Sequence, residues 1–285
     1  MIKYYTYDEM SRLYKSDMEK NEAVNQLILG NIKYIHTLVS KGDVLDENLR
    51  FGVIYDNDTP VYYFNNTPPY NMVVMPATPK NPTNPAYYGK VLAEEFNKNG
   101  VEISGIQCVY EFGTSFVSSY HKELKQNLAM DIMVATEIQK YPLVGEVYQA
   151  TMNDFGELCA FYKDFIKEAL GSERPMLEIA EQIRYKLSLP NSYIWLYRVD
   201  NKLVGMNMSN RQLEHGACVN AVYVVPEERR KGYCKQMVSW ASQYYLDHGY
   251  EYVTLYVDKT NPYSNAAYAA IGYDYICSVY TFEEE

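Results

Sequence analysis

The same order of helices and strands can be traced twice along the 285-residue chain, and this repetition limits the folds available to it. In the second half, apolar residues spaced three and four apart predict helices, and short β-branched and aromatic runs between turn residues predict strands. The order is helix, hairpin, strand, helix, strand, helix, strand. The predicted elements are Thr151–Leu170, Pro175–Leu187, Tyr193–Val199, Leu203–Ser209, Ala217–Val225, Tyr233–Asp247, Tyr252–Val257, Asn265–Ile271 and Asp274–Phe282.

The first half follows this order more faintly. We therefore expect two copies of one α/β fold, with residues 1–142 and 143–285 as the domains. The boundary is placed near Tyr141 and Pro142 because proline disfavours continuing a helix or strand there. The elements predicted in the first half are a helical stretch at Ser11–Leu38, continuous or with one break, strands at Phe51–Tyr55, Val61–Phe64 and Asn71–Met75, a helix at Ala86–Asn97, a strand at Gly105–Phe112, a helix at Ser115–Leu124 and a strand at Leu128–Thr136.

The composition excludes several classes of protein. A formal charge of −10 argues against a nucleic-acid partner, which requires a basic surface. No apolar run approaches the length of a membrane helix, and the first residues lack the apolar core of a secretion signal. The five cysteines and four histidines are scattered. We therefore expect a cytoplasmic protein with reduced thiols, no metal and no membrane partner. The sequence does not indicate an oligomeric state.

The most informative stretch lies between a predicted strand and the helix after it. Val222–Val225 ends the strand and Gly232 precedes the helix. The first turn of a helix carries unpaired backbone N–H groups and the positive end of the helix dipole, which together bind phosphate. Glycine lets a phosphate approach the backbone closely. Taken alone, the stretch is equally well a solvated basic turn or a phosphate loop. Its basic side chains are Arg229, Arg230, Lys231 and Lys235.

A second segment, Leu255–Tyr273, joins the end of a strand to a short helix. Asn261 is predicted to lie in the turn and Ser264 to cap the helix. Tyr268 falls one turn inside that helix. By itself it is more simply interpreted as a core tyrosine, because tyrosine suits positions that are apolar at one end.

Together, the two segments resemble the motifs of the GNAT superfamily of N-acetyltransferases. The family's phosphate loop reads Arg/Gln-x-x-Gly-x-Gly/Ala, and Arg229, Gly232 and Cys234 occupy its positions, with Cys234 where Gly or Ala is usual. The resemblance covers about residues 145–285. The ending looks like the branch of glycine N-acyltransferase-like proteins, some of which pair a degenerate N-terminal copy with an active C-terminal one. The family's later pattern, Asn-x-x-Ala/Ser-x-x-x-Tyr-x-x-x-Gly-Phe/Tyr, is matched by Asn261, Ser264, Tyr268, Gly272 and Tyr273.

The resemblance implies two tandem GNAT-like domains, each with a mixed, mostly antiparallel twisted sheet flanked by helices. Splayed parallel strands at 217–225 and 252–257 would bind acetyl-CoA in the second domain. A backbone N–H near Val224 would polarise the thioester carbonyl, and Tyr268 would give a proton or hydrogen bond to the departing thiolate. The cofactor-binding residues implied are Tyr223, Val224, Val225, Arg229, Arg230, Lys231, Gly232, Tyr233, Cys234, Asn261 and Ser264.

The general base is less well defined by the sequence. Glu227 follows the strand and is the leading candidate, with Glu228 beside it, although Pro-Glu-Glu is also a common solvated turn. Many members of the family use a chain of water molecules instead. Cys234 is not expected to act as a nucleophile, because no histidine is near it in sequence. The remaining candidates are Glu214, His215 and Asn220.

The expected function is an N-acetyltransferase that moves an acetyl group from acetyl-CoA to a small-molecule amine, by direct attack in a ternary complex. The alternatives are a catalytically inactive acyl-CoA-binding regulatory or scaffolding protein, and a transferase that uses a longer acyl chain. The first half should not bind CoA in this way. Its corresponding loop, from Pro76 to Pro85, is rich in proline, which lacks an N–H donor, and contains no arginine. We expect this half to cover the acceptor side of the active domain or to stiffen it.

Overall fold

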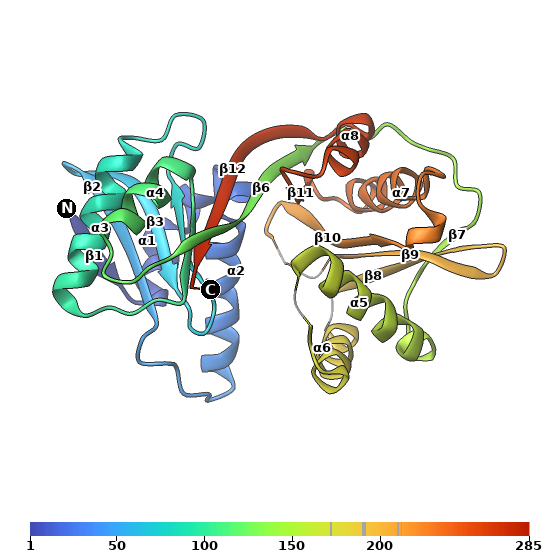
Figure 1. Cartoon of the computed structure of the whole chain (residues 1–285), viewed down its shortest axis with the longest axis horizontal. Coiled ribbons are helices and arrows are strands. Elements are labelled where there is room, and N and C mark those ends of the chain that lie inside the picture. The colour runs from blue at the N-terminus through green and yellow to red at the C-terminus, as the bar shows by residue number, and fades with distance from the viewer. Residues whose placement is uncertain (172, 190–191, 210, 212, 285) are drawn as a thin grey trace. The chain divides into compact units, whose positions relative to one another are not determined.

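The computed structural model describes residues 1–171, 173–189, 192–209, 211 and 213–284 (Figure 1). The described residues form two compact units. Unit 1 contains Met1–Met133, Tyr256–Asn261 and the chain from Tyr275 onward, and unit 2 contains Val134–Leu255 and Pro262–Asp274. The second half of the chain therefore contributes two segments to unit 1. None of the helices in the described part of the chain has the length and apolarity that crossing a bilayer requires.

Unit 1 is a mostly antiparallel sheet with helices packed on it. Its strands follow the order β1-β2-β3-β4-β5-β12-β6, and β4 and β5 are parallel. One core lies between the sheet and α3 and α4, and a second lies between the sheet and α1 and α2. The elements are β1 (Ile2–Tyr5), α1 (Tyr7–Glu19), α2 (Glu22–Ser40), β2 (Arg50–Asp56), β3 (Thr59–Asn66), β4 (Met72–Pro76), α3 (Pro85–Asn99), β5 (Gly105–Cys108), α4 (Tyr110–Ser119), β6 (Lys125–Ala135) and β12 (Asp274–Glu283).

The last strand of the chain lies inside the sheet of unit 1. Strand β12, red in Figure 1, is hydrogen-bonded between β5 and β6, and Tyr280 pairs with Cys108 in an antiparallel register with β5. Helix α4 packs closely over this strand. A Cβ at Gly113 would lie 2.1 Å from the Phe282 ring, so only glycine allows the approach. The core of unit 1 thus depends on residues from the end of the sequence.

Unit 2 repeats the order of elements seen in unit 1. Its strands follow the order β11-β10-β9-β8-β7, and only β10 and β11 are parallel within this set. Apolar residues of β8, β9 and β10 pack against α5 and α6 in one core. The elements are β7 (Glu146–Gln149), η1 (Met152–Asp154), α5 (Phe155–Leu170), α6 (Met176–Ser188), β8 (Tyr193–Val199), β9 (Lys202–Ser209), β10 (Gly216–Val224), η2 (Pro226–Glu228), α7 (Tyr233–Asp247), β11 (Tyr252–Asp258) and α8 (Pro262–Ile271).

The predicted fold class is confirmed, because both units are mixed α/β structures with mostly antiparallel sheets and flanking helices. Local signals explain several boundaries. Thr6 and Glu9 form a reciprocal capping box at the start of α1, and Gly171 ends α5 in a left-handed conformation with φ of 63°.

Three local predictions are wrong. The strand predicted at Gly105–Phe112 ends at Cys108, and α4 begins at Tyr110 instead of Ser115. Aromatic residues suit both strands and buried helix faces, so their abundance there misled the assignment. Helix α8 begins at Pro262, which suits the first turn because its missing N–H would have no partner there. Ser264 therefore lies inside the helix and does not cap it. The short strands β1 and β7 were not predicted.

Candidate active site

Two parallel strands, β10 and β11, pair over only part of their length. Strand β10 pairs with β11 from Gly216, opposite Tyr252, to Val219, opposite Leu255, where their register ends. The next residues of β10, Asn220 to Val222, are only half-buried. The edge of β10 that faces β11 is therefore open beyond Val219. Peptide groups on such an edge can pair with an extended ligand as with an additional strand.

A β-bulge in β10 lies at the point of separation. The register between β10 and β9 shifts between Asn220, opposite Met208, and Tyr223, opposite Met206. Ala221 within the bulge has φ of 47°, which is unusual for a residue with a side chain. Such bulges bend a strand and change the direction of its peptide groups.

Past the bulge, the peptide of Val224 points toward the open edge. The Val225 N–H donates to the Val204 carbonyl of β9 at 3.1 Å, so it faces the opposite edge. Because neighbouring N–H groups in a strand point to opposite edges, the Val224 N–H faces the edge of β10 that is paired with β11 only as far as Val219. The Val224 carbonyl, on that same side, accepts a hydrogen bond from Arg229 Nε at 2.9 Å. Val225, in contrast, directs its own N–H into the sheet.

The loop after β10 leads into an open helix N-terminus. Gly232 is the N-cap of α7, with φ of 85° and no side-chain cap hydrogen bond from the described residues. The nearest atom to a Cβ built at Gly232 is Gln236 Nε2 at 3.8 Å, so the backbone can be approached. The first helical hydrogen bond is from Gln236 N to the Gly232 carbonyl. The N–H groups of Tyr233 to Lys235 therefore remain for an anion.

The basic side chains of the loop have different roles in the structure. Arg229 lies 5.6 Å over the Tyr223 ring and pairs with Glu168 at 2.6 Å, which raises its pKa. It therefore links the loop to the strand end and to α5. Lys231 pairs with Glu228 at 2.7 Å. Arg230, exposed and with φ of 65°, has no ion-pair partner among the described residues.

Tyr268 on α8 lies close to the start of α7. Its side chain is 6% exposed, and its ring centroid lies 6.0 Å from that of Tyr273. Burial raises the pKa of Tyr268 well above its ordinary value, and the neighbouring Cys234 and Tyr273 raise it further. Burial likewise raises the pKa of Cys234 to about 11. Both groups hold their protons at neutral pH, which agrees with a hydrogen-bond donor at Tyr268 and with no thiolate at Cys234.

The other predicted residues are dispersed. Glu227 is exposed on η2, with Lys202 3.6 Å away. Glu228 is bonded to Lys202 and Lys231, and these cations lower its pKa. Asn261 donates its backbone N–H to the Asp258 carbonyl at the end of β11. His215 and Glu214 precede β10, at the end away from the bulge. No group of three or more His, Cys, Asp and Glu side chains in the described ranges could hold a metal ion.

The sequence interpretation missed a group of aromatic and acidic residues beside the bulge. Phe161 of α5 lies edge-on to Tyr223, with ring centroids 5.9 Å apart. Burial raises the pKa of Tyr223, and Asp164 and Glu168 raise it further through their negative charge. Phe161, Asp164 and Glu168 are three and four residues apart and so share one face of α5. This spacing was visible in the sequence, although nothing in it linked α5 to β10.

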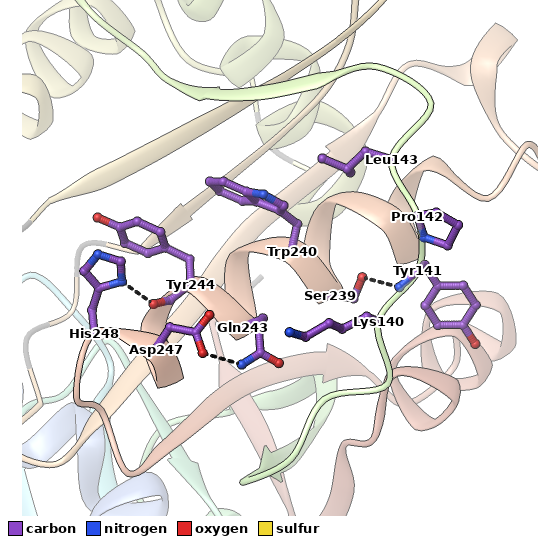
Figure 2. Close-up of a pocket in the computed structure, with 10 residues that line it drawn as sticks. All are labelled: Lys140, Tyr141, Pro142, Leu143, Ser239, Trp240, Gln243, Tyr244, Asp247 and His248. Atoms are coloured by element: carbon purple, nitrogen blue, oxygen red, sulfur yellow. Dashed lines mark hydrogen bonds between the residues drawn. The ribbon is translucent and has the colours of Figure 1, made fainter.

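A separate cavity of about 530 Å³ lies on the outer side of α7 (Figure 2). Trp240, Tyr244 and His248, each four residues apart, form one wall, and the segment from Lys140 to Leu143 forms the other. Tyr141 fixes this segment by donating its backbone N–H to Ser239 Oγ at 3.3 Å. None of the predicted site residues lines this cavity.

Comparisons with known proteins identify the same region. The sequence profile of the acetyltransferase (GNAT) family matches residues 158–273. No curated protein matches the chain. Among solved structures, a GNAT-family acetyltransferase from Colwellia psychrerythraea has 11% identity and a TM-score of 0.60, with all of both chains covered. A Drosophila protein has 15% identity and a TM-score of 0.66, over 99% of this chain and 98% of the other.

A third solved structure bears on the arrangement in two units. It is a tandem GNAT protein from the clavulanic acid biosynthesis pathway, with 10% identity and a TM-score of 0.55, over 99% of this chain and 97% of the other. At these identities the structural likeness concerns the fold, and it agrees with two GNAT-like units in one chain. The profile match indicates an acyltransferase that uses an acyl-CoA and acts on an amine. Residues 158–273 thus resemble a GNAT acetyltransferase domain in sequence profile, and the chain shares the fold of GNAT proteins.

Proposed function

We propose that this protein transfers an acetyl group from acetyl-CoA to a primary amine of a small molecule, by direct attack of the amine in a ternary complex. The observation that carries the proposal is the separation of β10 from β11 beside the N-terminus of α7. This arrangement offers an open strand edge and an anion site in succession, which matches the amide-rich arm and diphosphate of CoA.

The cosubstrate would be held mainly by backbone groups. The N–H groups of Tyr233 to Lys235 would bind the diphosphate, and Gly232 allows its oxygens to approach. Arg230 is the cation best placed to neutralise phosphate, because Arg229 and Lys231 already have carboxylate partners. Lys231 could exchange Glu228 for phosphate at small cost, since an exposed ion pair contributes little to stability.

The chemical step would use two donors. The Val224 N–H would bind the thioester oxygen and stabilise the negative charge that develops on it, an effect often worth roughly 3 kcal/mol. Tyr268 would hydrogen-bond to or protonate the thiolate as it leaves. Its raised pKa keeps it protonated at neutral pH, so it can donate in every cycle.

The route by which the amine loses its proton is the least defined step. Glu227 is proposed as the residue that draws the proton away through water, because it directly follows the strand end on η2. Its exposure and its ion pair with Lys202 are compatible with a chain of water molecules in place of a dedicated base. Asn220 and its neighbours at the bulge would line such a chain.

A cationic amine is the proposed acceptor. Asp164 and Glu168 lie near Tyr223 at the open end of β10, and their charge attracts a cation to this end. The alternative is a small amino acid, as in the glycine N-acyltransferase-like branch. The carboxylates of α5 favour a cationic amine, since an amino acid would also bring a carboxylate of its own.

Unit 1 is proposed to be a degenerate copy that does not bind CoA. Its third helix, α3, begins with Pro85 after Asn84, where unit 2 has Gly232 and Tyr233. The proline removes one N–H donor from the first turn, and no arginine precedes it. A cytoplasmic location is also proposed. It is supported by five unpaired cysteines, four of them buried.

Release of free thiol from acetyl-CoA, measured with polyamines, other cationic amines and glycine, tests the proposal. Turnover that requires an amine supports an enzyme. Binding of one CoA per chain without turnover on any amine would support the alternative of an inactive acyl-CoA-binding regulatory or scaffolding protein. If longer acyl-CoAs competed for the site more strongly than acetyl-CoA does, the acyl donor would be assigned as a longer acyl-CoA.

A further inference from the structure

Asn207, in the middle of β9, is fully buried, and neither of its side-chain polar atoms has a hydrogen-bond partner among the described residues. Buried amides in proteins are nearly always bonded, because taking an unbonded amide out of water is costly. The neighbouring polar groups are already used. Trp195, directly opposite on β8, donates its Nε1–H to the Tyr245 hydroxyl at 2.7 Å, and Ser209 also bonds that hydroxyl.

The position of Asn207 relative to β10 is specific. Met206 and Met208, on either side of it, pair with Tyr223 and Asn220. Asn207 therefore lies opposite two residues, Ala221 and Val222, one of which is the extra residue of the bulge. These are the residues at which β10 leaves β11 and changes the direction of its peptides.

The bulge needs a group that fixes its conformation. Ala221 is held at φ of 47°, a conformation that persists only where the surrounding structure imposes it. The amide of Asn207 is a buried polar side chain opposite this bulge. A single buried water can bond such an amide and two peptide groups at once, because its usual number of partners is about three.

We propose that Asn207 is a positioning residue for acyl transfer. Through one buried water it fixes the peptides of Ala221 and Val222, and thereby aims the Val224 N–H at the thioester oxygen. The inference rests on the proposed function for its kinetic consequence only. The restraint on the bulge is a property of the free protein and can be measured without turnover.

The test compares Asn207→Leu with a matched control, Asn65→Leu. Asn65 lies on β3, the corresponding strand of unit 1, and is also fully buried, with an Oδ1 that accepts no hydrogen bond from the part of the chain that the structure describes. Leucine has nearly the shape of asparagine but bonds nothing. In Asn207→Leu, we expect amide hydrogen exchange in residues 220–224 to be about 10-fold faster, with exchange in β8 unchanged. The control should leave exchange in β10 unchanged.

The kinetic arm uses the same two proteins. Because a misdirected donor acts only on the transition state, Asn207→Leu should lower kcat about 10-fold with KM for acetyl-CoA within about two-fold of wild type. If Asn207→Leu does not fold, Asn207→Ala takes its place, because alanine adds no volume. It should also speed amide exchange in residues 220–224 and lower kcat. Unchanged exchange in residues 220–224 together with unchanged kcat in the folded variant would overturn the inference. Absence of turnover in the wild type would reject the proposed function and leave the exchange result to decide the role of Asn207.

Discussion

The two units share an order of elements and differ at one junction, the passage from the strand before the long helix into that helix. In unit 1, all of β4 is buried and α3 begins with Asn84 and Pro85. In unit 2, the middle of β10 is half-buried and α7 begins at Gly232. Both units pair this strand in parallel with the next one. The same sheet arrangement is therefore present with or without the proposed CoA site. That site requires in addition an unpaired strand edge and a helix N-terminus with free N–H groups.

The largest expected effect is on cosubstrate binding. Gly232→Glu should weaken CoA binding at least about 100-fold, because the carboxylate repels phosphate and the side chain is strained at positive φ. Isothermal titration calorimetry measures this, and the wild type should bind one CoA per chain. Gly100→Glu is the control, since Gly100 also has positive φ and open space beside α3. Two CoA per chain would show that unit 1 has a site after all.

The next effect is on the chemical step. Tyr268→Phe should lower kcat by about 100-fold with little change in KM for acetyl-CoA, because only the departing thiolate needs the hydroxyl. Tyr120→Phe in unit 1, which removes a hydrogen bond to the Val101 carbonyl, is the control. It should leave kcat unchanged. Since the pKa of Tyr268 is raised well above 10, the wild type should keep its kcat up to about pH 9.5. A kcat of Tyr268→Phe equal to that of the wild type would remove this residue from the mechanism.

A smaller effect concerns the acceptor. Asp164→Asn should raise KM for a dicationic amine about 5-fold at low salt, and high salt should reduce the difference. Steady-state kinetics at two ionic strengths measure it. Asp131→Asn, which removes a partly buried partner of Lys259 in unit 1, should leave this KM unchanged. If Asp164→Asn instead affected glycine more than the diamine, the acceptor would be an amino acid.

The smallest effect compares two ion-paired carboxylates, Glu228, which is partly buried, and Glu102, which is exposed. Hydrogen bonds from Lys231 and then Lys202 lower the pKa of Glu228, and those from Lys122 and His121 lower that of Glu102 in unit 1. Each contributes stability above its unfolded pKa of 4.5, and the contribution is lost as the pH falls through the lower folded pKa. Glu228→Gln and Glu102→Gln should therefore both have a slightly lower Tm at pH 7, and the difference from wild type should shrink as the pH is lowered below 4.5.

These two variants should differ in CoA binding. Glu228→Gln frees Lys231 for phosphate and should tighten CoA binding about 2-fold, while Glu102→Gln should not. Calorimetry at pH 7 provides the comparison. Weaker binding by Glu228→Gln would indicate that Glu228 orients the loop.

The sequence predicted the parts of the fold and of the site that depend on neighbouring residues. The spacing of Gly232 from Arg229 and of Tyr268 from Asn261 is local, and the order of helices and strands follows from local periodicity. The interactions that decide the use of these residues are long-range. Arg229 reaches Glu168 on α5, and Asn207 lies against a bulge formed by another strand. Pattern and spacing carry no information about such contacts.

The insertion of β12 between β5 and β6 has a consequence for how the protein is made. Unit 1 contains the first 133 residues, yet its sheet lacks a strand until the chain has been synthesised beyond residue 280. During translation, the edge of β5 that pairs with β12 therefore stays unpaired until the rest of the polypeptide has left the ribosome. The half that emerges first is the half that finishes last, so loss of the final ten residues would damage the beginning of the protein rather than its end.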